Sequence, residues 1–253
     1  MARPLSTWLT QSILAAALTL AQPARAEITF AYAADSPLGS LFAARLTGEI
    51  TAADLHALQG QMETAALAGR RQMQLNSAGG DVDAALAIGR LMRSLEFDSM
   101  VLPRGQCDSA CVFVLAAGID KVVEGTVGIH RPYFSRIAVA EVGAALQGVK
   151  ADVEAYLAEM NIPTRLVEDM FSTDPAEMRV LTEAELGAYR LNSQDYVVRE
   201  ERAQRMADDH GLSREAYEAF RQDMNYRCRI FTGQPEPLKA CVREVAARHG
   251  ISL

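Results

Sequence analysis

The chain has 253 residues, a formal net charge of −7 and a hydrophobic fraction of 49%. This length suits one domain or one domain with a small extension, and the composition excludes collagen-like, low-complexity and wholly disordered proteins. The acidic balance, with a sequence pI near 5.2, argues against a nucleic-acid partner, because phosphate recognition needs clustered Lys and Arg. We therefore expect an acidic, soluble globular protein.

The first 26 residues have the three-part pattern of a secretory signal peptide. Arg3 precedes an apolar run over residues 13–20, and the segment ends in the small residues Ala24 and Ala26. The run is shorter than the roughly 20 residues that span a bilayer. The alternatives are an uncleaved anchor and an amphipathic N-terminal helix. No later stretch is long and apolar enough to cross a membrane, so we expect a periplasmic or secreted protein without a membrane span after cleavage.

Four cysteines are distributed unevenly, as Cys107, Cys111, Cys228 and Cys241. In an oxidising compartment, paired cysteines are more common than free thiols. Proximity favours the pairs Cys107–Cys111 and Cys228–Cys241, and a bridge that joins the two regions remains open. Because no Cys-x-x-Cys motif or histidine cluster accompanies them, we expect no metal site.

Strands and helices are predicted to alternate along the first half of the chain. Extended segments are expected at residues 41–50, 71–76, 99–102, 121–124 and 126–129, and helices at 52–68, 82–95 and 112–117. This alternation indicates βαβ units, an α/β fold and a mostly parallel sheet.

The second half of the chain is predicted to be mainly helical. Residues 138–160 form a long helical stretch with candidate breaks at Gly143 and Gly148, and Thr182 begins a further helix. Polar, charged helices follow, with a break at residues 210–211 and a restart at Ser213. We expect a signal peptide at 1–26, an α/β domain at 27–192 and a helical C-terminal extension at 193–253.

Three features of this pattern contain candidate catalytic or binding residues. Gly79 and Gly80 follow a strand, where bare N–H groups can bind an oxyanion; the alternative is a tight strand-to-helix connection. Ser109 lies at the start of an apolar helix, beside the N–H of Ala110, where developing negative charge is favoured; the alternative is a helix cap. His130 follows a short strand and can accept a proton near neutral pH; the alternative is a hydrogen-bonded or exposed histidine.

Taken in order, the segments around these residues resemble the Clp protease proteolytic subunits, within the wider Clp/crotonase superfamily. The resemblance covers about residues 45–190. It rests on LTGEI at 46–50, LNSAGGDV at 75–82, ALAI at 85–88, Ser109 followed by VFVLAAG at 112–118, GIHRP at 128–132 and, more weakly, MRVLTEAEL at 178–186.

The resemblance implies a ββα spiral core and a serine hydrolase site. Ser109 matches the nucleophile and His130 the general base, while Gly79, Gly80 and Ala110 match the oxyanion-binding positions. Such a serine needs an adjacent base, because its hydroxyl barely ionises at neutral pH. The helix at about 138–160 matches the region through which subunits of the family assemble, which implies a homo-oligomer.

The chain also departs from the family pattern. Ala78 replaces the usual proline before the two glycines, and cysteines flank Ser109 where relatives have small residues. Met178 stands where the family has its third triad residue, an aspartate. Asp174 is the replacement that we favour, with Glu177 as the alternative. Loss of the orienting acid costs orders of magnitude in rate.

We therefore expect an exported serine peptidase that acts through a Ser-His(-Asp) acyl-enzyme, with no cofactor, metal or ATP. Its partners would be peptides or unfolded protein segments. The main alternative is a catalytically degenerate member that acts as a periplasmic binding or assembly protein. Thioester chemistry of the crotonase type is disfavoured where coenzyme A is absent, and a serine–lysine dyad would need Lys121 or Lys150 near Ser109.

Overall fold

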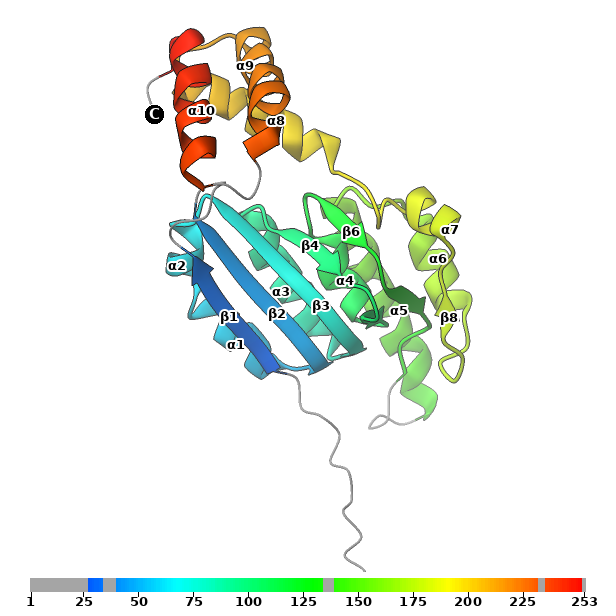
Figure 1. Ribbon diagram of the computed structural model, residues 1–253. Helices are drawn as coiled ribbons and strands as arrows, with labels where there is room; N and C mark the ends of the chain where they lie inside the picture. The colour runs from blue at the N-terminus through cyan, green and yellow to red at the C-terminus, as the bar shows by residue number, and fades with distance from the viewer. Residues whose placement is uncertain (1–26, 34–39, 134–138, 232–234, 252–253) are drawn as a thin grey trace, which may run out of the picture.

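The computed structural model describes residues 27–33, 40–133, 139–231 and 235–251 (Figure 1). The predicted signal peptide at 1–26 lies outside the described residues. Within them, the centre of the fold is an eight-stranded sheet. Its strands are β1 (Glu27–Ala33), β2 (Leu41–Ile50), β3 (Arg70–Gly80), β4 (Asp98–Val101), β5 (Gln106–Asp108), β6 (Lys121–Val123), β7 (Thr126–Ile129) and β8 (Arg179–Val180).

The sheet divides at β3. Residues 72–75 of β3 pair with β4, which in turn pairs with β6. Ser77, further along β3, pairs with Cys107 of β5, and β7 and β8 follow on that side. Every pairing is parallel except β1 with β2 and β7 with β8. The expected α/β fold with a mostly parallel sheet is confirmed.

Helices α1 and α3 lie behind β1–β3 in Figure 1, and α8–α10 gather beyond one end of the strands. The helices are α1 (Ala52–Gln59), α2 (Met62–Ala66), α3 (Val82–Ser94), α4 (Cys111–Ala116), α5 (Val139–Glu159), α6 (Arg165–Ser172), α7 (Glu183–Ala188), α8 (Tyr196–Asp209), α9 (Arg214–Cys228) and α10 (Pro235–Arg248), with a short 3₁₀ helix, η1 (Arg229–Phe231). Within the described ranges, no helix combines the length and apolarity that crossing a bilayer requires.

Some elements differ from those predicted. The helix expected at residues 52–68 is two helices, α1 and α2, because the chain turns at Gly60 and Gln61. Helix α5 runs without a break through Gly143 and Gly148. Residues 77–80 belong to β3, because Gly79 and Gly80 pair with the end of β2.

Tyr156 anchors helix α5 to helix α4. The phenol is fully buried, and its hydroxyl donates to the carbonyl oxygen of Phe113 in α4 at 2.7 Å. The two rings meet edge to face, with their centroids 6.2 Å apart, an arrangement that aromatic pairs favour. The C-terminal half of α5 is thus fixed to the core, while residues 141–150 contain no buried residue.

The C-terminal helices have a small hydrophobic cluster of their own. Its buried members are Phe220, Cys228, Leu238, Val245, Ala246 and Ile251. The disulfide Cys228–Cys241 joins α9 to α10. Ion pairs join the C-terminal helical region to the α/β core, including Arg93 with Asp195 and Arg205 with Glu96.

Lys121 is a buried cation where β6 begins. Its Nζ donates to the carbonyl of Gly118 at 2.9 Å. Burial lowers the pKa of Lys121 to about 8, while the negative charge of Asp195 acts in the opposite direction. An unfolded lysine titrates at about 10.4. Between these two values the unfolded chain binds more protons than the folded one, so the stability contributed by this site rises with pH.

We therefore expect the free energy of unfolding of the wild type, relative to Lys121→Met, to increase between about pH 7 and about pH 10. The expected increase is on the order of 2 kcal/mol. Urea unfolding of both proteins at a series of pH values measures it. A difference that stays constant over this range would contradict the lowered pKa, because methionine does not titrate.

Candidate active site

Ser109 occupies a sharp bend between β5 and α4. Its φ is 55°, a left-handed conformation that is uncommon for a residue with a side chain. Its N–H donates to the carbonyl of Gly128 in β7 at 2.9 Å, and its own carbonyl accepts from the N–H of Val112 at 3.0 Å. Helix α4 has Ala110 as N-cap and no side-chain cap. The helix-cap interpretation of Ser109 is therefore wrong.

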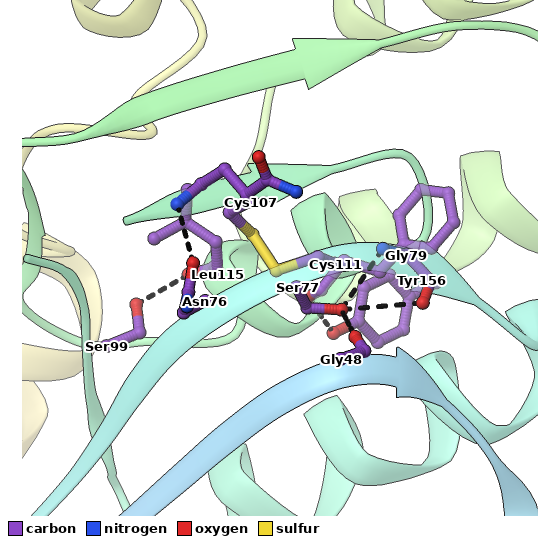
Figure 2. The surroundings of a disulfide bond; sticks show 11 residues. Gly48, Asn76, Ser77, Gly79, Ser99, Cys107, Cys111, Leu115 and Tyr156 are labelled. Carbon is purple, nitrogen blue, oxygen red and sulfur yellow. Dashed lines mark hydrogen bonds between the residues drawn. A yellow bond between two sulfur atoms is a disulfide. The ribbon is translucent and has the colours of Figure 1, made fainter. Parts of the chain in front are cut away.

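The disulfide Cys107–Cys111 closes around this bend. Figure 2 shows it beside Ser77, Gly79 and the buried end of Tyr156. Both sulfur-bearing residues are fully buried. Together with Cys228–Cys241, it confirms the pairing that proximity favoured. The bridge fixes the last strand residues before Ser109 to the first turn of α4.

Gly79 lets β3 approach the serine closely. Its φ is 98°, and a Cβ at this position would lie 2.7 Å from the Cβ of Ser109 and 3.0 Å from the amide nitrogen of Ala110. The N–H of Gly79 donates to the buried hydroxyl of Ser77 at 3.1 Å, and this hydroxyl donates to the carbonyl of Gly48 (Figure 2). The N–H of Gly79 is thus bound within the protein.

Of the three predicted oxyanion-binding residues, Gly80 and Ala110 are better placed than Gly79. The N–H of Asp81 pairs with the carbonyl of Ile50 in β2 at 2.9 Å. Because successive N–H groups of an extended chain point to opposite sides, the N–H of Gly80 points away from β2. Ala110 is the N-cap of α4, so its N–H has no partner within the helix. These two N–H groups are therefore the candidates for binding a ligand beside Ser109.

His130 is buried where β7 ends. Its Nδ1 lies 2.9 Å from the carbonyl oxygen of Arg131. Because a carbonyl oxygen can only accept, the neutral ring carries its proton on Nδ1 and leaves the lone pair of Nε2 free to accept one. The ring of Tyr133 stacks on the imidazole, with centroids 6.4 Å apart and planes 28° from parallel.

Ser109 and His130 line the same cleft, with a volume of about 1010 Å³. The two glycines and Tyr133 also line it. Within the described part of the chain, no hydrogen bond joins Ser109 directly to His130. Catalytic hydrogen bonds are often long in the unliganded state and tighten when substrate binds. The fold therefore brings the predicted nucleophile, base and glycines into one cleft.

The third triad residue stays a prediction. Asp174 is exposed, and its carboxylate accepts the N–H of Ala176 at 2.8 Å. The preceding carbonyl, of Thr173, accepts the N–H of Arg131 at 3.0 Å, which places this loop beside the residue after His130. Among the described residues, no hydrogen bond joins His130 to Asp174 or Glu177.

Neither lysine proposed for a dyad contacts Ser109. Lys121 donates to Gly118, and Lys150 pairs with Glu154 at 3.5 Å on α5. These contacts favour His130 as the basic group near the serine.

Sequence reasoning missed three polar residues at this site: Ser77, Asp108 and Tyr133. Ser77 is fully buried and holds Gly79. Burial raises the pKa of Asp108, and a hydrogen bond from the backbone of Gly128 and the charge of His130 act in the opposite direction. A polar side chain directly before the predicted nucleophile was a signal for Asp108, whereas Ser77 and Tyr133 act through contacts that arise only on folding.

Comparison with known proteins places this arrangement in a family. The family model described as Clp protease matches residues 44–179. No match is found among the curated proteins. Among solved structures, a mutant form of ClpP1 from Listeria monocytogenes has a TM-score of 0.47 and 17% sequence identity, covering 59% of this chain and 88% of that chain. Because the family model spans more than half of its length, the chain belongs to the Clp protease family.

Proposed function

We propose that the protein is an exported serine peptidase with Ser109 as nucleophile and His130 as general base. The observation that carries the proposal is the position of Ser109, held at a left-handed bend in the cleft that His130 also lines. The N–H groups of Gly80 and Ala110 supply the oxyanion hole. This arrangement has the three parts that acyl transfer needs: a nucleophile, a base and fixed donors for developing negative charge.

In the proposed reaction, Ser109 Oγ attacks the carbonyl carbon of a peptide bond while its proton passes to Nε2 of His130. The carbonyl oxygen becomes an oxyanion that Gly80 and Ala110 stabilise. The C–N bond then breaks, and the departing amine takes the proton from His130. Water, deprotonated by the same imidazole, hydrolyses the acyl-enzyme and restores the serine.

The proposed setting is an oxidising compartment outside the cytosol. Two disulfides among the described residues support it, because such bonds are rare in cytosolic proteins. The signal-peptide pattern of residues 1–26 supports export. Without ATP in that compartment, the substrates would be peptides or unfolded segments that diffuse into the cleft.

We also propose that the protein assembles with copies of itself through α5. Val142 and Leu146 of this helix are only partly buried in the single chain, whereas Val149 packs against the hydrophobic core. Contact with a second copy would bury Val142 and Leu146 further. Sedimentation of the purified protein would measure the assembly.

A fluorophosphonate probe tests the catalytic proposal. The phosphorus of the probe bonds to an activated serine Oγ and releases fluoride, so labelling requires both the nucleophile and its base. We expect the mature wild-type protein to be labelled, Ser109→Ala to show none, and His130→Ala to lose at least about a hundredfold in rate. Labelling that persists in Ser109→Ala would place the nucleophile elsewhere.

A catalytically degenerate binding protein is the second candidate. The observation that favours it is Met178, an uncharged residue at the position that corresponds to the family's aspartate. A folded wild-type protein without any labelling, whose cleft still binds unfolded peptides, would establish this alternative instead.

A further inference from the structure

We propose that Asp108 is the carboxylate that supports His130 as a base. This inference rests on the peptidase site proposed above and adds a positioning residue to it, one that acts on the substrate only through His130. Neither the sequence pattern nor the hydrogen bonds of the imidazole assign such a carboxylate. The side chains packed on one face of β7 support this assignment.

The carboxylate of Asp108 lies directly over the backbone of Gly128. Asp108 is the last residue of β5 and pairs with Gly128 in β7. A Cβ added to Gly128 would lie 2.5 Å from Oδ1 of Asp108, so the missing side chain leaves the space that the carboxylate fills. Alternate residues of an extended chain project from the same face. His130, two residues after Gly128, therefore projects from the face on which Asp108 lies.

The opposite strand supports this placement. Gly128 pairs with Val180 and Ile129 with Arg179 in the antiparallel β7–β8 pair, so the next position along sets His130 opposite Met178. Residues opposite each other in such a pair share a face. The Sδ of Met178 would lie 2.6 Å from the same added Cβ on Gly128. Asp108 and Met178 thus share the face of His130, and Asp108 is the charged one of the two.

Two groups support His130, one through a hydrogen bond and the other through its charge. The carbonyl of Arg131 binds Nδ1 and sets the tautomer, which needs no carboxylate. Burial raises the pKa of Asp108, while a hydrogen bond from the backbone of Gly128 and, to a smaller extent, the charge of His130 lower it. Because this interaction is mutual, ionised Asp108 favours the imidazolium that forms when Ser109 loses its proton.

Other charged groups line the same cleft as the imidazole. Glu49 of β2, and Asp81 and Asp83 at the start of α3, line the cleft. The Asp81 carboxylate is engaged at the N-terminus of α3, where it accepts the N–H of Ala84 at 2.8 Å. Asp174 follows the loop residue whose carbonyl binds Arg131. Asp108 differs from all of them because its carboxylate packs against the strand that carries His130.

The experiment is the pH dependence of fluorophosphonate labelling, from about pH 5 to about pH 9, a range that brackets ordinary histidine titration. It compares the wild type with Asp108→Asn, Asp108→Ala and Asp108→Glu. We expect the acid limb of the pH–rate profile to move to lower pH in the two neutral variants, and their maximal labelling rate to fall about tenfold. Asp108→Glu, which restores the charge, is expected to recover much of both.

Asp209→Asn is the matched control, because it removes the same charge from the exposed end of α8. Its profile is expected to follow the wild type. Circular dichroism and thermal melting establish that each variant is folded before its profile is compared.

The outcomes separate this inference from the proposed function. If the wild type is labelled and the Asp108 variants keep its acid limb, the inference is wrong while the peptidase proposal stands. A lowered rate without a shifted limb would show a merely structural role and would also overturn it. If Asp174→Asn moves the limb and Asp108→Asn does not, the carboxylate is Asp174. If the folded wild type is not labelled at all, the peptidase proposal itself fails.

Discussion

Replacing Gly79 with alanine is expected to abolish labelling of Ser109 and to lower the free energy of unfolding by about 2–5 kcal/mol. The φ of 98° is strained for any residue with a side chain. The new Cβ would lie 2.7 Å from the Cβ of Ser109 and 2.8 Å from the carbonyl oxygen of Asp108. Because both neighbours lie at the bend that holds Ser109, β3 and this bend must move apart.

Gly187→Ala is the matched control for this substitution. Gly187 lies in α7, and a Cβ there would meet nothing within 4 Å. We expect unchanged labelling and a stability equal to the wild type or up to about 1 kcal/mol higher, because alanine favours helix more than glycine does. Chemical unfolding and labelling rates, measured on both variants, test the pair. Normal labelling of Gly79→Ala would show that the close approach of β3 is not needed for reactivity.

The sequence predicted the parts of the fold that depend on local interactions. The capped helix start at Thr182 is confirmed, with the N–H of Thr182 bound to Glu185 at 2.9 Å, and Ser213 is the N-cap of α9. These signals act within a few residues. In contrast, the antiparallel edge strand β1 was not predicted, and the last residues of β3 were not assigned to a strand, because their extended conformation depends on pairing with β2.

The candidate site was likewise predictable only where local sequence patterns identify its residues. The residue types and their order identify Ser109, His130 and the two glycines as candidates, and the structure places them at one cleft. The internal use of the Gly79 N–H by Ser77 depends on a contact that forms only when β2 and β3 pair. The environment of Asp108 likewise arises from β5, β7 and β8 meeting at Gly128. Contacts between strands distant in the sequence leave no local pattern.

We expect the two disulfides to differ in their effects on stability and on the labelling of Ser109. Removing each bridge separately tests this expectation. Loop-closure entropy predicts a stability loss of about 2 kcal/mol for the Cys107–Cys111 bridge and about 3 kcal/mol for Cys228–Cys241, because the second closes the longer loop. The expected effects on the labelling rate have the opposite order, because removal of the Cys107–Cys111 bridge causes the larger loss. Only the first bridge encloses Ser109, whereas the second holds α9 to α10 within the C-terminal cluster.

In the double variant Cys107→Ala/Cys111→Ala, we expect the labelling rate to fall by about tenfold or more. Holding Ser109 at a φ of 55° costs on the order of 1–2 kcal/mol, and each 1.4 kcal/mol is worth about tenfold in the population of the reactive bend. Without the bridge, the backbone hydrogen bonds of Ser109 with Gly128 and Val112 must hold the bend. Cys228→Ala/Cys241→Ala, measured in parallel, should unfold at lower denaturant yet label at the wild-type rate under native conditions. Equal loss of labelling in both variants would mean that the bridge around Ser109 acts through general stability and not through the conformation of the nucleophile.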